Sequence, residues 1–156
     1  MQTMNSKVLE QYKFYRLCEY DFDAALHTLK ILRRYKRSDV KNVLIRDITV
    51  AYARPFSTNR GELSKQNLSL EFVPLPMRGL HKELIDLRNQ LFAHTDLIFK
   101  NPKVTNWSSR QRKWFPMSFR GVDYNNLHKR IDEISGLIYA VQNELLKKTR
   151  ELENYF

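Results

Sequence analysis

The chain has 156 residues, 42% of them hydrophobic and only four of them glycine, which favours one folded domain with a substantial core over a disordered chain. Its 27 Lys and Arg against 17 Asp and Glu give a formal net charge of +10, which favours polyanionic partners. No apolar run approaches the roughly 18 residues of a membrane span, and the N-terminal residues lack the pattern of a secretory signal. The single cysteine, Cys18, excludes an internal disulfide framework. We therefore expect a cytoplasmic domain with no membrane partner.

Hydrophobic periodicity predicts two helices in the first third of the chain. Apolar residues recur three or four positions apart over about 7–35, which is the spacing of one helix face. Ser38 or Asp39 fits the N-cap of a second helix. This helix should end at or just before Arg54, because Pro55 disfavours the helical conformation of the residue before it.

Two long connections separate the remaining helices. The first, about 55–76, contains a polar–apolar alternation over 68–72 that predicts a short extended piece. A third helix is predicted over about 77–98. The second connection, about 99–122, is punctuated by Pro116 and Gly121 between aromatic and β-branched residues, which indicates a hairpin-like arm.

The last helix is predicted from about Tyr124 to near the C-terminus, because its apolar residues follow a four-three spacing that only Lys148 breaks: Leu127, Ile131, Ile134, Ile138, Val141, Leu145 and Leu152. The expected fold is therefore all-α, a single domain over residues 1–156. We expect an up-and-down bundle of about four helices with two long connections.

The third predicted helix carries the most informative segment, residues 84–96. On a helical wheel its apolar residues form one stripe, and Arg88 and His94 lie on either side of that stripe, about 40° and 80° away. Both side chains should thus lie at the border between core and solvent, where a polar group is held firmly and still reaches a ligand. The stripe consists of Leu84, Leu87, Leu91 and Ile98.

Arg88-Asn89-x-x-x-x-His94 resembles the Arg, polar residue, short gap, His signature of the HEPN superfamily. HEPN proteins are small all-α bundles, many of them RNases of toxin–antitoxin and abortive-infection systems. The resemblance implies a homodimer in which Arg and His of two protomers line one cleft and cleave RNA without metal. It also implies a possible antitoxin-like protein partner. A purely structural reading stays open, in which Arg88 forms a salt bridge and His94 binds backbone.

The site roles follow from the chemistry of these residues. His94 would be the general acid or base, since imidazole titrates near neutral pH, and Arg88 would hold the phosphate and stabilise the transition state. Asn89 would position a phosphate oxygen or the histidine ring. Asp96 either orients His94 or ends the helix. Supporting candidates are Arg54, beside an anchoring Phe56, and His81, which is more simply an exposed residue of the first helical turn.

The second connection is strongly basic. No acid occurs between Asp96 and Asp123, and aromatic residues alternate with the cations there. Cations that meet phosphates and aromatic rings that stack on bases are typical of single-stranded RNA recognition. The alternative is a solvated loop whose aromatics hold it against the bundle. The RNA-binding candidates are Lys100, Lys103, Trp107, Arg110, Arg112, Lys113, Trp114 and Arg120.

Other chemistries lack support in the sequence. The four histidines have no metal-ligand spacing and there is one cysteine, so no metal is expected. No glycine-rich phosphate loop occurs, so no nucleotide cofactor is expected either. The leading hypothesis is a metal-independent endoribonuclease of HEPN type. The alternatives are a non-catalytic HEPN-like module that binds RNA or a protein, and a structural dimeric bundle.

Overall fold

A computed structural model describes residues 6–92 and 95–156, and most of these residues are helical, as the sequence predicts. None of the described helices is long and apolar enough to cross a membrane. The α-helices are α1 (Ser6–Leu32), α2 (Ser38–Ala53), α3 (Arg78–Leu87), α4 (Leu97–Lys100), α5 (Tyr124–Lys129) and α6 (Ile131–Glu153). Short 3₁₀ turns, η1 (Arg54–Phe56), η2 (Leu70–Phe72) and η3 (Leu75–Met77), lie in the first connection.

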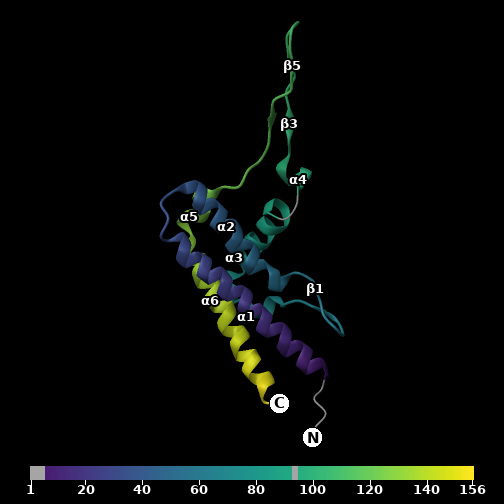
Figure 1. The fold of residues 1–156 in the computed structure, drawn as a ribbon, viewed down its shortest axis with the longest axis vertical. Coiled ribbons are helices and arrows are strands. Elements are labelled where there is room, and N and C mark those ends of the chain that lie inside the picture. The colour runs from purple at the N-terminus through teal and green to yellow at the C-terminus, as the bar shows by residue number, and fades with distance from the viewer. Residues whose placement is uncertain (1–5, 93–94) are drawn as a thin grey trace.

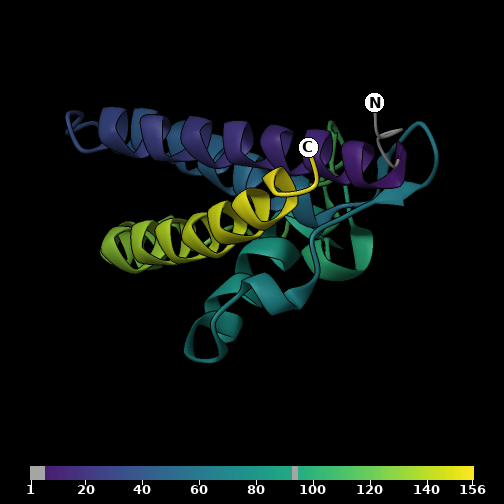
Figure 2. The ribbon, with the colours of Figure 1, turned by 90° about the horizontal axis from the view of Figure 1, so that it is seen from below.

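The long helix α1 is the centre of the helical body. It packs against α2 along one side and α6 along the other, with α3 beside α2 (Figures 1 and 2). Phe22 of α1, Tyr52 of α2, Leu84 of α3 and Ile138 of α6 are completely buried in one shared core. Burying these apolar surfaces supplies most of the free energy that holds the helices together. Cys18 belongs to the same core, and burial raises the pKa of its thiol.

The predicted end of α2 is confirmed, but its predicted N-cap is not. The helix begins at Ser38 and ends at Ala53, immediately before the Arg54-Pro55 step. The N-cap residue is Arg37, without a side-chain cap, and Asp39 lies in the first turn. The predicted capping residues Ser38 and Asp39 are therefore the first two residues of the helix. The Asp39 carboxylate accepts a hydrogen bond from the Arg37 guanidinium.

The first connection contains a small hairpin that α1 holds in place. Strand β1 (Asn59–Arg60) pairs antiparallel with β2 (Lys65–Gln66), and the turn between them bonds to the buried carboxylate of Glu10 through the backbone N–H of Leu63, at 2.8 Å. A Cβ at Gly61 would lie 2.3 Å from the backbone carbonyl oxygen of Ser64 and equally close to Glu10 Oε1, so this position requires glycine. The extended piece predicted over 68–72 is wrong. Leu70–Phe72 is a 3₁₀ turn that buries Leu68 and Phe72 and leaves Leu70 exposed.

The third predicted helix is shorter than expected. It ends as α3 at Leu87 and continues as a π-helical turn, η4 (Arg88–Phe92), before α4 begins at Leu97. Ile98 belongs to the separate helix α4, so the predicted stripe does not run along one helix. Leu84 is buried, but Ile98 is 93% exposed, which corrects its assignment to the core. His94 and the side chain of Leu91 lie outside the described residues.

The predicted C-terminal helix is two helices, α5 and α6, which meet at Arg130. The Arg130 guanidinium donates to Glu83 of α3 at 2.6 Å and to Glu133 at 3.2 Å, so the break is braced by ion pairs. The four-three stripe of α6 is confirmed as core, because Ile134, Ile138 and Val141 are buried.

His81 is a core residue, so the expectation of an exposed first-turn histidine is wrong. Its Nδ1 lies 2.8 Å from the hydroxyl oxygen of Tyr52, and its ring packs edge-on against Phe56. Burial, with a smaller contribution from Arg78, lowers the pKa of His81 below its ordinary value of 6.5. The folded protein therefore holds this imidazole neutral.

This shift predicts the pH dependence of stability. Below about pH 6.5 the unfolded chain binds more protons at His81 than the folded chain, so the stabilisation is complete above that pH and falls as the pH is lowered. We expect His81→Gln to flatten the decline in the free energy of unfolding between about pH 7.5 and pH 5.5, measured by urea denaturation. Some decline should remain, because burial also lowers the pKa of His128. An unchanged slope in His81→Gln would contradict this assignment.

Candidate functional site

The motif residues Arg88 and Asn89 lie at the point where α3 changes into the π turn η4. Arg88 is half-buried, as predicted, and its Nη1 donates to Asn89 Oδ1 at 2.8 Å. The Asn89 side chain is thus engaged by the guanidinium of its neighbour. Single π turns inside helices are frequent at functional sites, because they turn a side chain out of the regular helical register.

The Arg88 guanidinium is only partly satisfied. Its Nε is buried and has no hydrogen-bond partner within residues 6–92 and 95–156. A buried, charged N–H group without a partner is costly, and such groups call for an explanation such as a ligand. The guanidinium therefore retains hydrogen-bonding capacity for an anion.

Phe92 anchors the motif segment to two other helices. Its ring stacks on Tyr124 of α5 with the centroids 6.4 Å apart and the planes 14° from parallel. The Arg46 guanidinium of α2 lies over the same ring, 5.7 Å from its centroid. Burial raises the pKa of Tyr124 although Arg46 acts to lower it, so this phenol stays neutral. We call Arg46, Phe92 and Tyr124 the Phe92 clamp.

Two further buried polar atoms lie on the helices that carry the Phe92 clamp, and neither has a hydrogen-bond partner among the described residues. Asn42 Oδ1 lies one helical turn from Arg46 on α2, and His128 Nε2 lies one turn from Tyr124 on α5. Arg88 has the same relation to Phe92 on η4. Each element of the clamp thus carries an unsatisfied polar group one turn away, within the part of the chain that the structure describes.

The three supporting candidates, Asp96, Arg54 and His81, form contacts with other residues. Asp96 accepts a 2.8 Å hydrogen bond from the backbone N–H of Phe99 and is the N-cap of α4. Asp96 thus lies at a helix boundary, although it begins α4 instead of ending the predicted helix. The Arg54 guanidinium pairs with Asp21 of α1 at 3.2 Å. His81 bonds to Tyr52 in the core. None of the three forms a hydrogen bond or ion pair with Arg88 among residues 6–92 and 95–156.

The second connection is a β-hairpin, the arm that the sequence predicts. Strand β3 (Lys103–Val104) pairs with β6 (Met117–Ser118), and β4 (Trp107–Ser108) pairs with β5 (Lys113–Trp114), all antiparallel and in one continuous register. The hairpin projects far from the helical body, as the green segment of Figure 1 shows. At its base, the Arg120 guanidinium lies over the ring of Phe99, 5.3 Å from the centroid.

The tryptophans do not hold the arm against the helices. Trp107 and Trp114 are directly opposite each other near the tip, pack edge to face at 6.0 Å, and are 64% and 62% exposed. Phe115 and Phe119 are exposed as well. The alternative of a loop fixed to the bundle by its aromatics is therefore wrong, and ring surface is open to a ligand.

The cations of the arm are also available. Lys100 is half-buried and the other five are exposed. None of the six forms an ion pair with any residue of the described ranges. Since the arm contains no acid, these charges create one uncompensated positive surface. The cations are Lys100, Lys103, Arg110, Arg112, Lys113 and Arg120.

No cluster of His, Cys, Asp and Glu that could ligate a metal ion occurs among residues 6–92 and 95–156. Comparison of the chain with models of protein families, with curated proteins and with solved structures finds no match.

Sequence reasoning missed the Phe92 clamp. Arg46 and Tyr124 lie in other helices, and no local spacing signals that both contact Phe92. Only the aromatic residue inside the motif, between Arg88 and His94, could have suggested that the segment is anchored by a ring.

Proposed function

We propose that this protein binds single-stranded RNA along its arm and cleaves it as a metal-independent endoribonuclease of HEPN type. The observation that carries the proposal is the arm, in which two exposed tryptophans lie among six cations that form no ion pair within residues 6–92 and 95–156, in a stretch without acids. The finer fold expectation, an up-and-down HEPN-like bundle that forms a homodimer, belongs to the same proposal.

The arm suits unpaired RNA better than a duplex. Exposed indole rings offer stacking surfaces to bases, and each stacked base contributes about 1–3 kcal/mol, but bases inside a duplex are already stacked. The cations meet the phosphates, and release of counterions makes such binding dependent on salt. Together these groups bind a flexible strand with little dependence on sequence.

The catalytic part of the proposal rests on the motif. The Arg88 guanidinium, with a buried N–H that has no partner in the described residues, would bind the scissile phosphate and stabilise the charge of the transition state. A ribose 2′-hydroxyl would lose its proton and attack the adjacent phosphorus, while the bond from phosphorus to the 5′-oxygen breaks and that oxygen gains a proton. His94 would act as the general acid or base in these proton transfers. The products are a cyclic phosphate and a 5′-hydroxyl. An antitoxin-like protein would be the natural partner of such an enzyme.

A non-catalytic RNA-binding module is the second candidate. It is favoured by the engagement of Asn89 Oδ1 with Arg88, because that contact occupies a side chain that the mechanism assigns to the phosphate or the histidine. The two candidates share the arm and differ in cleavage, so binding and cleavage are measured separately.

The first prediction concerns binding. Arg110→Glu, Arg112→Glu and Lys113→Glu combined should weaken binding to a single-stranded oligoribonucleotide on the order of a hundredfold at moderate salt and flatten the log–log salt dependence. The matched control reverses Arg34, Lys36 and Lys129, exposed cations on the helical body, and produces the same net charge. We expect the control to bind like the parent in fluorescence anisotropy titrations. Equal losses in both variants would show attraction by net charge alone.

The second prediction concerns cleavage. His94→Ala should slow cleavage by about 10²–10⁴-fold, the usual contribution of a general acid or base, and Arg88→Ala should slow it comparably. Binding should change little in the His94 variant. A chelator should leave the parent's rate unchanged, and a substrate with 2′-deoxyribose at the scissile nucleotide should bind without being cleaved. If the parent binds RNA and cleaves none, the protein is the non-catalytic module.

A further inference from the structure

The face of the arm that carries the tryptophans continues to the base of the arm. Lys103 and Ser118 are directly opposite each other in the ladder, four residues along their strands from Trp107 and Trp114, which are also opposite each other. Residues an even number of positions apart lie on the same face of a strand. The four side chains therefore share one face, with the tryptophans about 13 Å nearer the tip, from a rise of about 3.3 Å per residue.

Lys103 and Ser118 also line a pocket of about 250 Å³, which we call the Lys103 pocket. Three cations meet there with two neutral hydrogen-bonding side chains and one aromatic ring, and the described lining contains no carboxylate. None of the three cations forms an ion pair with any residue of 6–92 and 95–156. The lining residues are Lys100, Asn101, Lys103, Ser118, Phe119 and Arg120.

Contacts at the base of the arm hold this pocket together. The backbone N–H of Arg120 donates to the carbonyl of Lys100 at 2.8 Å, which ties the two sides of the pocket. The Arg120 guanidinium lies over the ring of Phe99, 5.3 Å from its centroid. Asn101 ends α4 in the left-handed conformation, with φ 43°, so the chain turns between Lys100 and Lys103. The cations are thus brought together by the fold.

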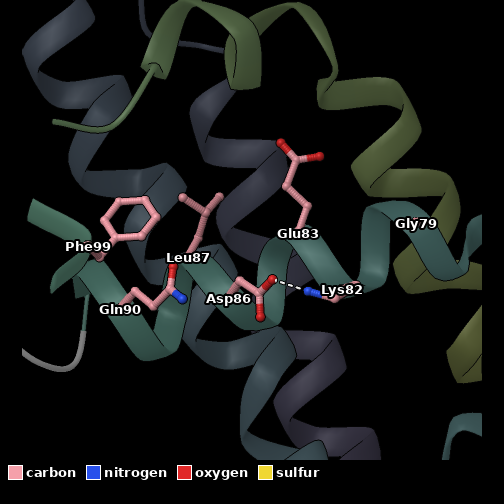
Figure 3. Close-up of a pocket in the computed structure, with 7 residues that line it drawn as sticks. All are labelled: Gly79, Lys82, Glu83, Asp86, Leu87, Gln90 and Phe99. Carbon is pink, nitrogen blue, oxygen red and sulfur yellow. Dashed lines mark hydrogen bonds and ion pairs between the residues drawn. The ribbon is translucent and has the colours of Figure 1, made fainter. Parts of the chain in front are cut away.

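A pocket on α3 differs in its charges (Figure 3). Its lining carries two carboxylates and one lysine. Lys82 pairs with Asp86 at 2.6 Å, and Glu83 pairs with Arg130 at 2.6 Å. This pocket does not attract an anion, whereas the Lys103 pocket combines a concave shape with positive charge that no described acid compensates.

The lining of the Lys103 pocket fits a terminal phosphate. A phosphate inside an RNA strand is a diester with one negative charge, whereas a phosphate monoester carries about −1.5 to −2 charges at pH 7 and three strong acceptor oxygens. Three cations, a hydroxyl and an amide can donate to all three oxygens. Pockets for drug-sized ligands have volumes of about 300–1,000 Å³, so this smaller pocket suits a phosphate with its sugar better than a complete cofactor.

We propose that the Lys103 pocket binds the terminal phosphate monoester of a single RNA strand whose neighbouring bases stack on Trp107 and Trp114. The shared face of the hairpin lets one strand make both contacts. The inference rests on the proposed RNA binding by the arm and adds a preference for strands with a phosphorylated end.

Oligoribonucleotides of one sequence that differ only at their ends test this preference. A phosphate at one end should tighten binding on the order of tenfold or more relative to a strand with two hydroxyl ends, because it adds charge-assisted hydrogen bonds. Comparison of a 5′-phosphate with a 3′-phosphate identifies the end that enters the pocket. A hydroxyl-ended strand with two further nucleotides carries similar added charge as diesters, and we expect a smaller gain from it.

Substitutions in the pocket locate the preference. Lys103→Gln with Arg120→Gln should reduce the gain from the terminal phosphate to about twofold or less, while the hydroxyl-ended strand still binds at the tryptophans. Because Arg120 also contacts Phe99, Lys103→Gln alone is the second variant, and it should lose part of the gain with that contact in place. The control, Arg34→Gln with Lys36→Gln, lowers the net charge equally on the helical body and should keep the full gain.

The outcomes separate this inference from the proposed function. Equal affinity for phosphorylated and hydroxyl-ended strands, or a gain that the double pocket variant keeps, would overturn the inference and leave RNA binding by the arm in place. A gain equalled by the longer hydroxyl-ended strand would overturn it too, since charge alone would then explain the effect. If no strand binds, the proposed function fails and the inference fails with it.

Discussion

The constraint on which the structure depends is the separation of a buried apolar core from an arm that buries almost nothing. The helices α1, α2, α3 and α6 bury their apolar side chains against one another, and Phe22, Tyr52 and Leu84 are completely buried. The arm has rings, aliphatic side chains and cations, but no core of its own and no acid. A hairpin with so little buried surface gains little stability from its own side chains, and these side chains are exposed to other molecules.

Specific contacts anchor the base of the arm on one side and the motif segment on the other. Asp96 caps α4, and α4 places Phe99 beneath the Arg120 guanidinium at the base of the hairpin. The backbone N–H of Arg120 also donates to the carbonyl of Lys100 at 2.8 Å. On the other side, the Phe92 clamp fixes the motif segment to α2 and α5.

The sequence predicted those parts of the fold that local patterns determine. The end of α2 follows from Pro55, the buried stripe of α6 from its spacing, and the arm from Pro116 and Gly121 between aromatic residues. It failed where tertiary contacts decide. The helix predicted over 77–98 is interrupted, so Ile98 lies in the separate helix α4 and is exposed. His81 is buried because Tyr52 and Phe56 from the preceding helix and turn enclose it. The same holds for the candidate site. The cations and tryptophans of the arm lie in one stretch of sequence and were predicted, whereas the Phe92 clamp joins three segments that are distant in the sequence and was not.

Both tryptophans of the chain, Trp107 and Trp114, lie in the arm, so intrinsic fluorescence reports on the arm without any label. The most direct test is to titrate the protein with a single-stranded oligoribonucleotide and record tryptophan emission beside the anisotropy of labelled RNA. If bases stack on the arm, emission is quenched with the same midpoint as the anisotropy change, and both shift together with salt. Binding by anisotropy with unchanged tryptophan emission would contradict the assignment of the arm as the RNA-binding surface.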